Sequence, residues 1–166
     1  MTFRWVGNTA WRTLMALLPA LARPDDLFAE TLLPETEYAL YKTMDVRDRA
    51  HAYAVTRQLL ARYPDASPVL RRAALLHDVG KTSVRYNPWL RILAALYTPR
   101  RVAPEPRLGG VRGAWQLKRH HDRYGAALIL GVGGDARVAE IVARHHTGGD
   151  TTDLEAARLR ETDASF

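Results

Sequence analysis

The stretch AALLHDVGKT, residues 73–82, decides which fold the sequence predicts. An apolar segment with helical spacing ends there on His77 and Asp78, and Val79-Gly80-Lys81 follows at once. A histidine beside a carboxylate is a poor end for a buried helix, because burying either group costs free energy unless it is paired. The same two groups are good ligands for a divalent metal ion. We therefore predict that the helix ends here because its last residues bind a cation.

The composition is that of a soluble globular protein. Hydrophobic residues make up 47% and charged residues 25% of 166 residues, which suits one domain with a hydrophobic core. Lys and Arg outnumber Asp and Glu by 24 to 18, which favours an anionic partner, although a genome biased toward Arg explains the excess equally well. The chain has no cysteine, so any metal must be held by nitrogen and oxygen ligands.

The N-terminal segment contains an apolar run, residues 14–22, that could pass for the core of a signal peptide. The run is short and contains Pro19. Apolar residues within it and before it recur at helical spacing, namely Trp5, Trp11, Leu14 and Leu18. An amphipathic helix that packs on the core is therefore favoured. No run reaches the roughly 18 apolar residues that span a bilayer. We expect a cytoplasmic protein without a membrane partner.

Apolar residues recur every three or four positions along most of the chain, and the alternating pattern of strands is missing, so the predicted fold class is all-α. Asp45, Ser67 and Asp135 are expected N-caps, and Gly80 is expected to end its helix in the left-handed conformation. Thr152 is expected to cap the last helix in a capping box with Glu155. The expected helices begin near residues 4, 35, 45, 67, 87, 114, 135 and 152.

The longest irregular stretch is residues 98–113, which contain three Pro and three Gly. Loops of this length are usually functional or disordered. This one carries Arg100, Arg101, Arg107 and Arg112. It is either a lid over a phosphorylated substrate or a solvated connector.

The six histidines carry the strongest functional signal. They all lie on predicted helices or at helix ends, at positions 51, 77, 120, 121, 145 and 146. A single histidine on an apolar helix is more often a core residue than a ligand, but six of them on four helices, with Asp78 and Asp163 placed similarly, fit that explanation poorly. Adjacent helical residues point about 100° apart. His77 and Asp78 therefore share one ion only at a helix end, or contact two ions.

These residues carry a resemblance to a known family. His51, His77-Asp78 and Asp163 resemble the H…HD…D pattern of the HD superfamily of metal-dependent phosphohydrolases, over about residues 45–166. LLHDVGK, residues 75–81, is typical of the central motif. HDRYGAALIL, residues 121–130, and IVARHHTGG, residues 141–149, are similar to later segments of two-metal HD proteins. These motifs are most similar to those of small bacterial HD phosphohydrolases, which are related to dinucleoside-tetraphosphate hydrolases and HD-GYP phosphodiesterases.

The resemblance implies an HD helical bundle over residues 45–166, with residues 1–44 as an N-terminal helical extension on the core. It implies divalent ions, two in number, with Mn, Fe, Co, Ni or Mg as the candidates. The implied ligands of the first ion are His51, His77, Asp78 and Asp163. Those of the second are His121, His145 and His146, with Asp78 bridging. Either His120 or His121 is the ligand, and the register of the following Gly-Ala favours His121.

The activity implied is hydrolysis of a phosphomonoester or phosphodiester bond in a small nucleotide-type substrate, by a hydroxide that the metal activates at Asp78. Lys81 and Arg49 are candidates to neutralise the phosphoryl charge, although a lysine there could also offset the helix dipole. His120, if it is not a ligand, could protonate the leaving group.

Two departures from the relatives limit the substrate. Arg47 stands where HD-GYP proteins usually have a Glu ligand, and TGGDTT follows His146 in place of a GYP triad. Cyclic di-GMP hydrolysis of the HD-GYP type is therefore not expected.

Two other functions and the oligomeric state stay open. A catalytically silent HD module that senses a nucleotide is the main alternative. A nucleic-acid partner is not expected, because the arginines lack interleaved aromatic residues on which bases could stack. A homo-oligomer is possible through the N-terminal helix.

Overall fold

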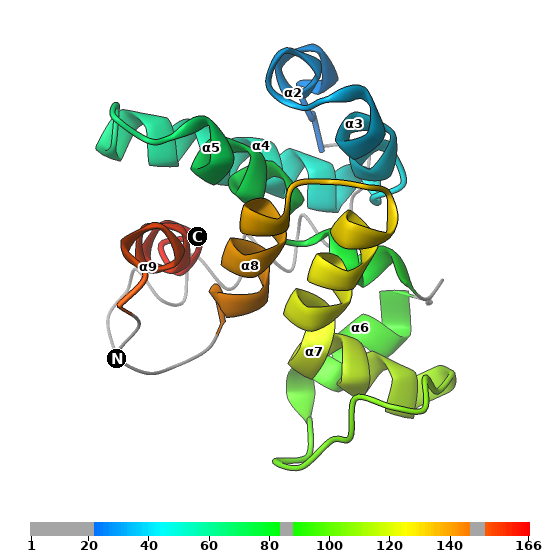
Figure 1. The fold of residues 1–166 in the computed structure, drawn as a ribbon. Coiled ribbons are helices and arrows are strands. Elements are labelled where there is room, and N and C mark those ends of the chain that lie inside the picture. The colour runs from blue at the N-terminus through cyan, green and yellow to red at the C-terminus, as the bar shows by residue number, and fades with distance from the viewer. Residues whose placement is uncertain (1–21, 84–87, 147–151) are drawn as a thin grey trace.

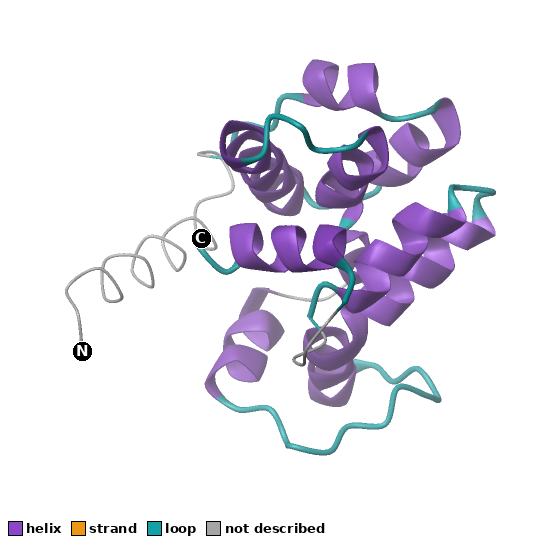
Figure 2. Cartoon of the chain, turned by 60° about the vertical axis from the view of Figure 1, so that its left-hand side comes forward, coloured by secondary structure: helices purple, strands orange, loops and turns teal. Residues whose placement is uncertain are grey.

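The computed structural model describes residues 22–83, 88–146 and 152–166, and within these ranges it contains helices and no strand (Figure 1, Figure 2). The all-α prediction is confirmed. The helix predicted over residues 4–22 lies outside the described residues. No helix in the described ranges has both the length and the apolar character needed to cross a bilayer.

The elements follow the predicted order with two additions, α2 and the 3-10 helix η2. They are α2 (Asp26–Leu32), α3 (Glu35–Lys42), α4 (Val46–Arg62), α5 (Pro68–Leu76), the 3-10 helix η2 (Val79–Ser83), α6 (Pro88–Leu96), α7 (Gly110–Gly131), α8 (Ala136–Arg144) and α9 (Leu154–Asp163). Helix α2 was not predicted because its seven residues are too few to show an apolar period. Its N-terminus is capped by Asp25, whose side chain accepts a hydrogen bond from the Phe28 N–H at 2.9 Å.

Most predicted caps are confirmed. Asp45, Ser67 and Asp135 each accept a hydrogen bond from a backbone N–H in the first turn of the following helix. The prediction for the last helix was wrong by one residue. Asp153, not Thr152, caps α9, because its carboxylate accepts from the N–H groups of Glu155 and Ala156, each at 3.2 Å. A carboxylate accepts both of these bonds and also favours the positive end of the helix.

Helix α7 begins at Gly110, four residues before the predicted start at residue 114. The two glycines in its first turn argued against a helix there. Gly110 has φ +59°, which favours glycine, and a Cβ on Gly113 would lie 2.1 Å from the Leu108 carbonyl oxygen. These glycines therefore let the chain turn tightly into the helix.

Helix α5 lies at the centre of the core. It packs against α4, α8 and α9, and its last four residues, Ala73 to Leu76, have no solvent exposure. The surrounding helices contribute buried side chains that include Leu59, Ile141 and Leu159. The last turn of α5 is apolar on every side and therefore belongs in the interior. The chain therefore delivers His77 and Asp78, which follow α5 directly, to the inside of the protein.

Gly80 was predicted to adopt a left-handed conformation, and this prediction was wrong. Only Gly110 and Gly133 have positive φ in the part of the chain that the structure describes, and Gly80 lies within η2. Close packing, and not backbone conformation, requires a glycine at position 80. A Cβ on Gly80 would lie 1.9 Å from the carbonyl oxygen of His121 and 2.6 Å from the backbone nitrogen of Gly125. Its missing side chain therefore lets α7 pack directly against the backbone that follows His77-Asp78.

Helix α3 is fastened to the core by a buried ion pair. Glu37 is fully buried, and both of its oxygens accept hydrogen bonds from the Arg72 guanidinium, at 2.8 and 2.5 Å. One oxygen also accepts from the Asp135 N–H at 3.1 Å. A buried carboxylate is tolerated when its lone pairs are used in this way. The pair links α3, α5 and the start of α8.

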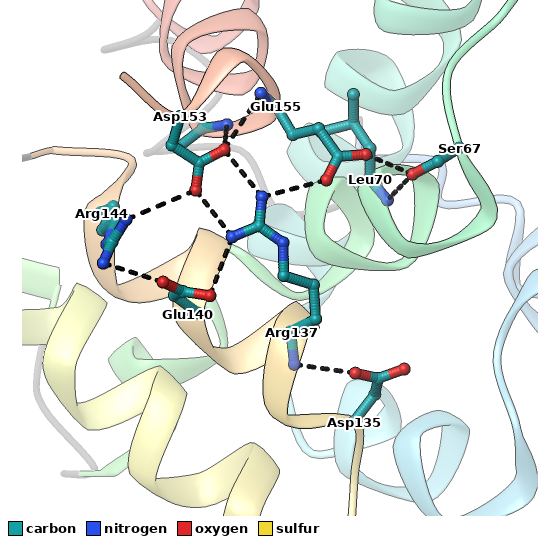
Figure 3. Close-up of polar contacts among 9 residues, drawn as sticks. Ser67, Leu70, Asp135, Arg137, Glu140, Arg144, Asp153 and Glu155 are labelled. Carbon is teal, nitrogen blue, oxygen red and sulfur yellow. Dashed lines mark hydrogen bonds and ion pairs between the residues drawn. The ribbon is translucent and has the colours of Figure 1, made fainter. Parts of the chain in front are cut away.

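Arg137 links α8 to α9 and, through Glu155, to the start of α5 (Figure 3). Its guanidinium donates to both oxygens of Asp153, at 2.8 and 2.9 Å, and to Glu155 at 3.2 Å. Glu155 in turn accepts from the Ser67 hydroxyl, which caps α5. These contacts hold together three helices whose C-terminal ends carry candidate ligands.

Replacing Arg137 by Ala is expected to lower the free energy of unfolding by about 1–3 kcal/mol, because it leaves the buried Asp153 without its main partner. The Arg137 side chain is partly exposed, which places the effect below that of a fully buried pair. Denaturant unfolding measures the change. Arg62→Ala, which removes an exposed ion pair with Glu161, is the matched control and should cost less than about 1 kcal/mol. Equal losses in both variants would contradict the assignment.

Candidate metal centre

Five helices bring the predicted ligands together. His51 lies on α4, His77 and Asp78 follow α5, His121 lies on α7, His145 and His146 follow α8, and Asp163 ends α9. Three of these helices, α5, α8 and α9, therefore end at the cluster. The C-terminus of a helix carries partial negative charge, which favours a cation.

The two carboxylates lie among the imidazoles. Asp163 Oδ1 is 2.9 Å from His51 Nε2 and 3.6 Å from His77 Nε2. The two oxygens of Asp78 face different histidines. Its Oδ2 is 3.6 Å from His77 Nε2, and its Oδ1 is 3.4 Å from His121 Nε2. Asp78 therefore lies between the two sets of histidines.

The remaining histidines pack around one another. The rings of His145 and His146 have centroids 3.9 Å apart, and those of His121 and His146 are 4.7 Å apart. His77 and His145 are 5.3 Å apart. In each of three groups, nitrogen and carboxylate oxygen atoms lie within 4.8 Å of one another, which is close enough for one ion. The groups are His51/His77/Asp78, His77/His145/Asp163 and His121/His145/His146.

Three of the imidazoles are oriented as metal ligands are. The Nδ1 atoms of His77, His121 and His145 lie 2.8, 2.9 and 2.6 Å from backbone carbonyl oxygens three or four residues earlier. An Nδ1–H that donates to a carbonyl leaves the lone pair on Nε2. All three Nε2 atoms are buried without a hydrogen-bond partner among the described residues. Buried polar atoms rarely lack a hydrogen-bond partner, and bound cations would satisfy these three Nε2 atoms.

Burial and nearby positive charge keep most of these imidazoles neutral. Burial, with the Lys81 ammonium nearby, lowers the pKa of His121 to about 3. Burial and neighbouring histidines also hold the pKa of His145 well below its usual value and lower that of His146. Neutral imidazole is the form that binds metal. Burial would raise the pKa of Asp78, but Lys81 and the nearby histidines hold it well below its usual range.

His77 differs from its neighbours. Burial would lower its pKa, but the nearby carboxylates of Asp78 and Asp163 outweigh burial and raise it to about 9. Without metal, His77 is therefore protonated at pH 7, and a metal ion must displace that proton.

Metal binding is consequently expected to release close to one proton from His77 at pH 7. Its affinity should rise by up to tenfold per pH unit until about pH 9, where His77 loses its proton in the metal-free protein. Calorimetric titration in buffers of different ionisation enthalpy counts the released protons. An affinity that does not change between neutral and mildly alkaline pH would contradict the protonated state of His77.

Lys81 reaches the cluster. Its Nζ lies 2.5 Å from Asp78 Oδ2, and about a third of its side chain is exposed. The ammonium therefore neutralises the buried carboxylate and stands at the edge of the site.

The structure places Arg49 and His120 outside the cluster. Arg49 forms an ion pair with Asp26 at 3.1 Å and donates to the Met44 carbonyl at 3.0 Å, so it joins α4 to the segment before it. The His120 Nε2 atom lies 2.7 Å from the Val102 carbonyl oxygen. Because His120 and His121 are adjacent on α7, their side chains point in different directions, and His121 is the one that faces Asp78.

The loop before α7 is held by α7 side chains. Gln116 bonds the backbone of this loop at three places, and the Tyr124 hydroxyl donates to the Pro104 carbonyl at 2.6 Å. His120 contacts the same loop at Val102. These contacts favour the connector over the lid.

A family model of the HD domain matches residues 49–165. The chain belongs to the HD domain family. HD domains form a superfamily of metal-dependent phosphohydrolases and bind divalent metals. Searches of curated proteins and of solved structures returned no match.

Two features of this HD site were missed by the sequence reasoning. Gly80 and Gly125 form the close contact between η2 and α7. In the sequence, Gly125 served only to favour His121 over His120 as the ligand. Phe166 packs edge-on against His51, with ring centroids 5.6 Å apart. A single aromatic residue near the C-terminal end of the sequence carried no pattern that could have pointed to this contact.

Proposed function

We propose that this HD protein is a metal-dependent phosphohydrolase that cleaves a phosphomonoester or phosphodiester bond in a nucleotide-type substrate. The observation that carries the proposal is the set of three buried, unpartnered Nε2 atoms facing two ionised carboxylates. The family supports the reaction class. The excess of Lys and Arg suits an anionic substrate.

The proposed ligand sets are those that the motifs imply. His51, His77, Asp78 and Asp163 would hold one divalent ion, and His121, His145 and His146 a second, with one Asp78 oxygen toward each set. A bound divalent ion polarises a phosphoryl oxygen and lowers the pKa of a coordinated water toward neutrality.

The chain's own residues orient and neutralise the substrate. Lys81 lies beside Asp78 with part of its side chain exposed, so its ammonium can donate to a phosphoryl oxygen bound at the cluster. His146 is exposed, whereas His77 and His145 are fully buried, so the substrate would approach from the His146 side. Arg49 and His120 have no part in this proposal, because their side chains are engaged elsewhere.

The test is phosphate or nucleoside release from a panel of nucleotides, dinucleoside polyphosphates and cyclic dinucleotides, with Mn, Co, Ni and Mg added in turn. We expect turnover of at least one substrate that requires the metal. Lys81→Met should lower kcat about 100- to 1,000-fold while metal still binds, since it removes one charge-assisted donor. A protein that binds metal and nucleotide but releases nothing from the panel would contradict hydrolysis and favour the silent sensor.

A further inference from the structure

Helix α6 exposes a continuous row of large apolar side chains. Trp89, Leu93, Leu96 and Tyr97 are 67%, 49%, 79% and 65% exposed. Tyr97 continues the helix, because its N–H donates to the Leu93 carbonyl at 3.0 Å. At 100° per residue the four side chains fall on one face of the helix. We call this set the α6 ridge. Single exposed apolar residues are ordinary, but a contiguous set marks an interaction surface.

The α6 ridge lies away from the N-terminal helices. Helix α6 packs against α7, on the side of the molecule opposite α2 and α3 (Figure 1). The hydrophobic core formed by α4, α5, α8 and α9 does not use these side chains. Their exposure therefore has no explanation within the described fold.

Basic residues lie beside the C-terminal end of the ridge. Arg100 and Arg101 follow it in the chain and are exposed. Lys118 donates to the Ala94 carbonyl at 2.9 Å and Arg119 to the Pro99 carbonyl at 3.2 Å, so both lie beside the C-terminal end of α6. We call these four residues the basic rim. Residues 79–121 contain nine Lys and Arg but a single acid, Glu105, which is paired with Arg107 at 3.5 Å. The positive charge of the whole chain is thus concentrated in the segment of sequence that contains the ridge.

We propose that the α6 ridge and the basic rim bind an anionic lipid surface. Trp, Tyr and Leu are the side chains that enter the interface of a bilayer, and Lys and Arg at the edge pair with anionic headgroups. Charge decides against a second copy of the chain, because a two-fold contact would press the same basic rim against itself. A folded acidic protein would need a groove that fits the ridge, whereas a lipid interface accepts it without one.

This inference is independent of the proposed function, and it replaces the expectation that the chain has no membrane partner. That expectation rested on the absence of an apolar run long enough to span a bilayer. A helix that lies in the interface needs only one apolar face, and α6 supplies one in nine residues.

Vesicle co-sedimentation of the full chain tests the proposal. We expect binding to vesicles of phosphatidylcholine mixed with phosphatidylglycerol, little binding to phosphatidylcholine alone, and release at high salt, where the charges are screened. No binding to the mixed vesicles at low salt would overturn the proposal. Equal binding to both kinds of vesicle would overturn the role of the basic rim.

Matched variants separate the ridge from the rest of the surface. L93Q/L96Q should reduce partitioning to the mixed vesicles at least tenfold. R100Q/R101Q should reduce it about fivefold for each charge removed. The control is L27Q, which changes an equally exposed leucine (75%) on α2 and should bind as the wild type does. An unchanged L93Q/L96Q, or an equal loss in L27Q, would contradict the assignment. So would a dimer in sedimentation that L93Q/L96Q dissociates, because a second copy would then occupy the ridge.

Discussion

Asp78→Asn is expected to abolish turnover and to weaken divalent metal binding by more than about 100-fold. Changing a residue that only supports a ligand costs about 10- to 100-fold in affinity, and Asp78 faces His77 with one oxygen and His121 with the other. The substitution keeps the shape of the side chain and removes its charge. Equilibrium dialysis with Mn or Ni measures the binding, and circular dichroism in EDTA shows whether the variant folds.

The chain offers a matched control for this variant. Asp122 follows His121 and thus forms a second His-Asp pair, but its Oδ1 accepts from the Arg123 N–H and it lies outside the three ligand groups. Asp122→Asn should bind metal as the wild type does. Metal binding that survives Asp78→Asn in a folded protein would remove Asp78 from the site.

Gly80→Ala is expected to have the largest effect on stability. The new methyl would lie 1.9 Å from the His121 carbonyl oxygen, and a backbone atom cannot move away without displacing α7. Overpacking of a core lowers the free energy of unfolding by about 1–3 kcal/mol. We expect a loss at or above the upper end of this range, because the new methyl would meet backbone atoms. A loss of about 3 kcal/mol lowers Tm by about 6–12 °C in a chain of this size.

The same variant should weaken metal binding, because a displaced α7 moves His121 away from Asp78. Gly131→Ala is the control. Nothing lies within 4 Å of a Cβ at Gly131, which ends α7, so alanine should be neutral or slightly stabilising there. A Gly80→Ala protein with unchanged Tm would show that the backbone contact between η2 and α7 is not tight.

Local signals in the sequence were enough for most of the helices. The apolar spacing predicted α4, α5 and α8, and Asp45, Ser67 and Asp135 marked their first residues, because a cap depends on neighbours within one turn. Helix α2 and the first turn of α7 were missed where the segment was short or glycine-rich. The role of Gly80 depends on His121 and Gly125 of α7, more than forty residues away in the chain, and no local pattern contains it.

The candidate site could be predicted as a set of residue types but not as a geometry. Histidine and aspartate at helix ends indicated a metal, and the motif spacing named the residues that the structure brings together. The sequence could not tell which side chains are used for structure. Arg49 looked like a phosphate ligand because it precedes His51, yet Asp26 and a backbone carbonyl engage it. Such a contact depends on where a distant helix packs.

The most direct test of the metal centre is a crystal structure of the protein grown with Mn, with the ion located by its anomalous scattering. We expect a peak within about 2–2.5 Å of an Asp78 oxygen and of the Nε2 atoms of His77 or His121. An ion found elsewhere, with the Nε2 atoms of His77, His121 and His145 still without a partner, would contradict it.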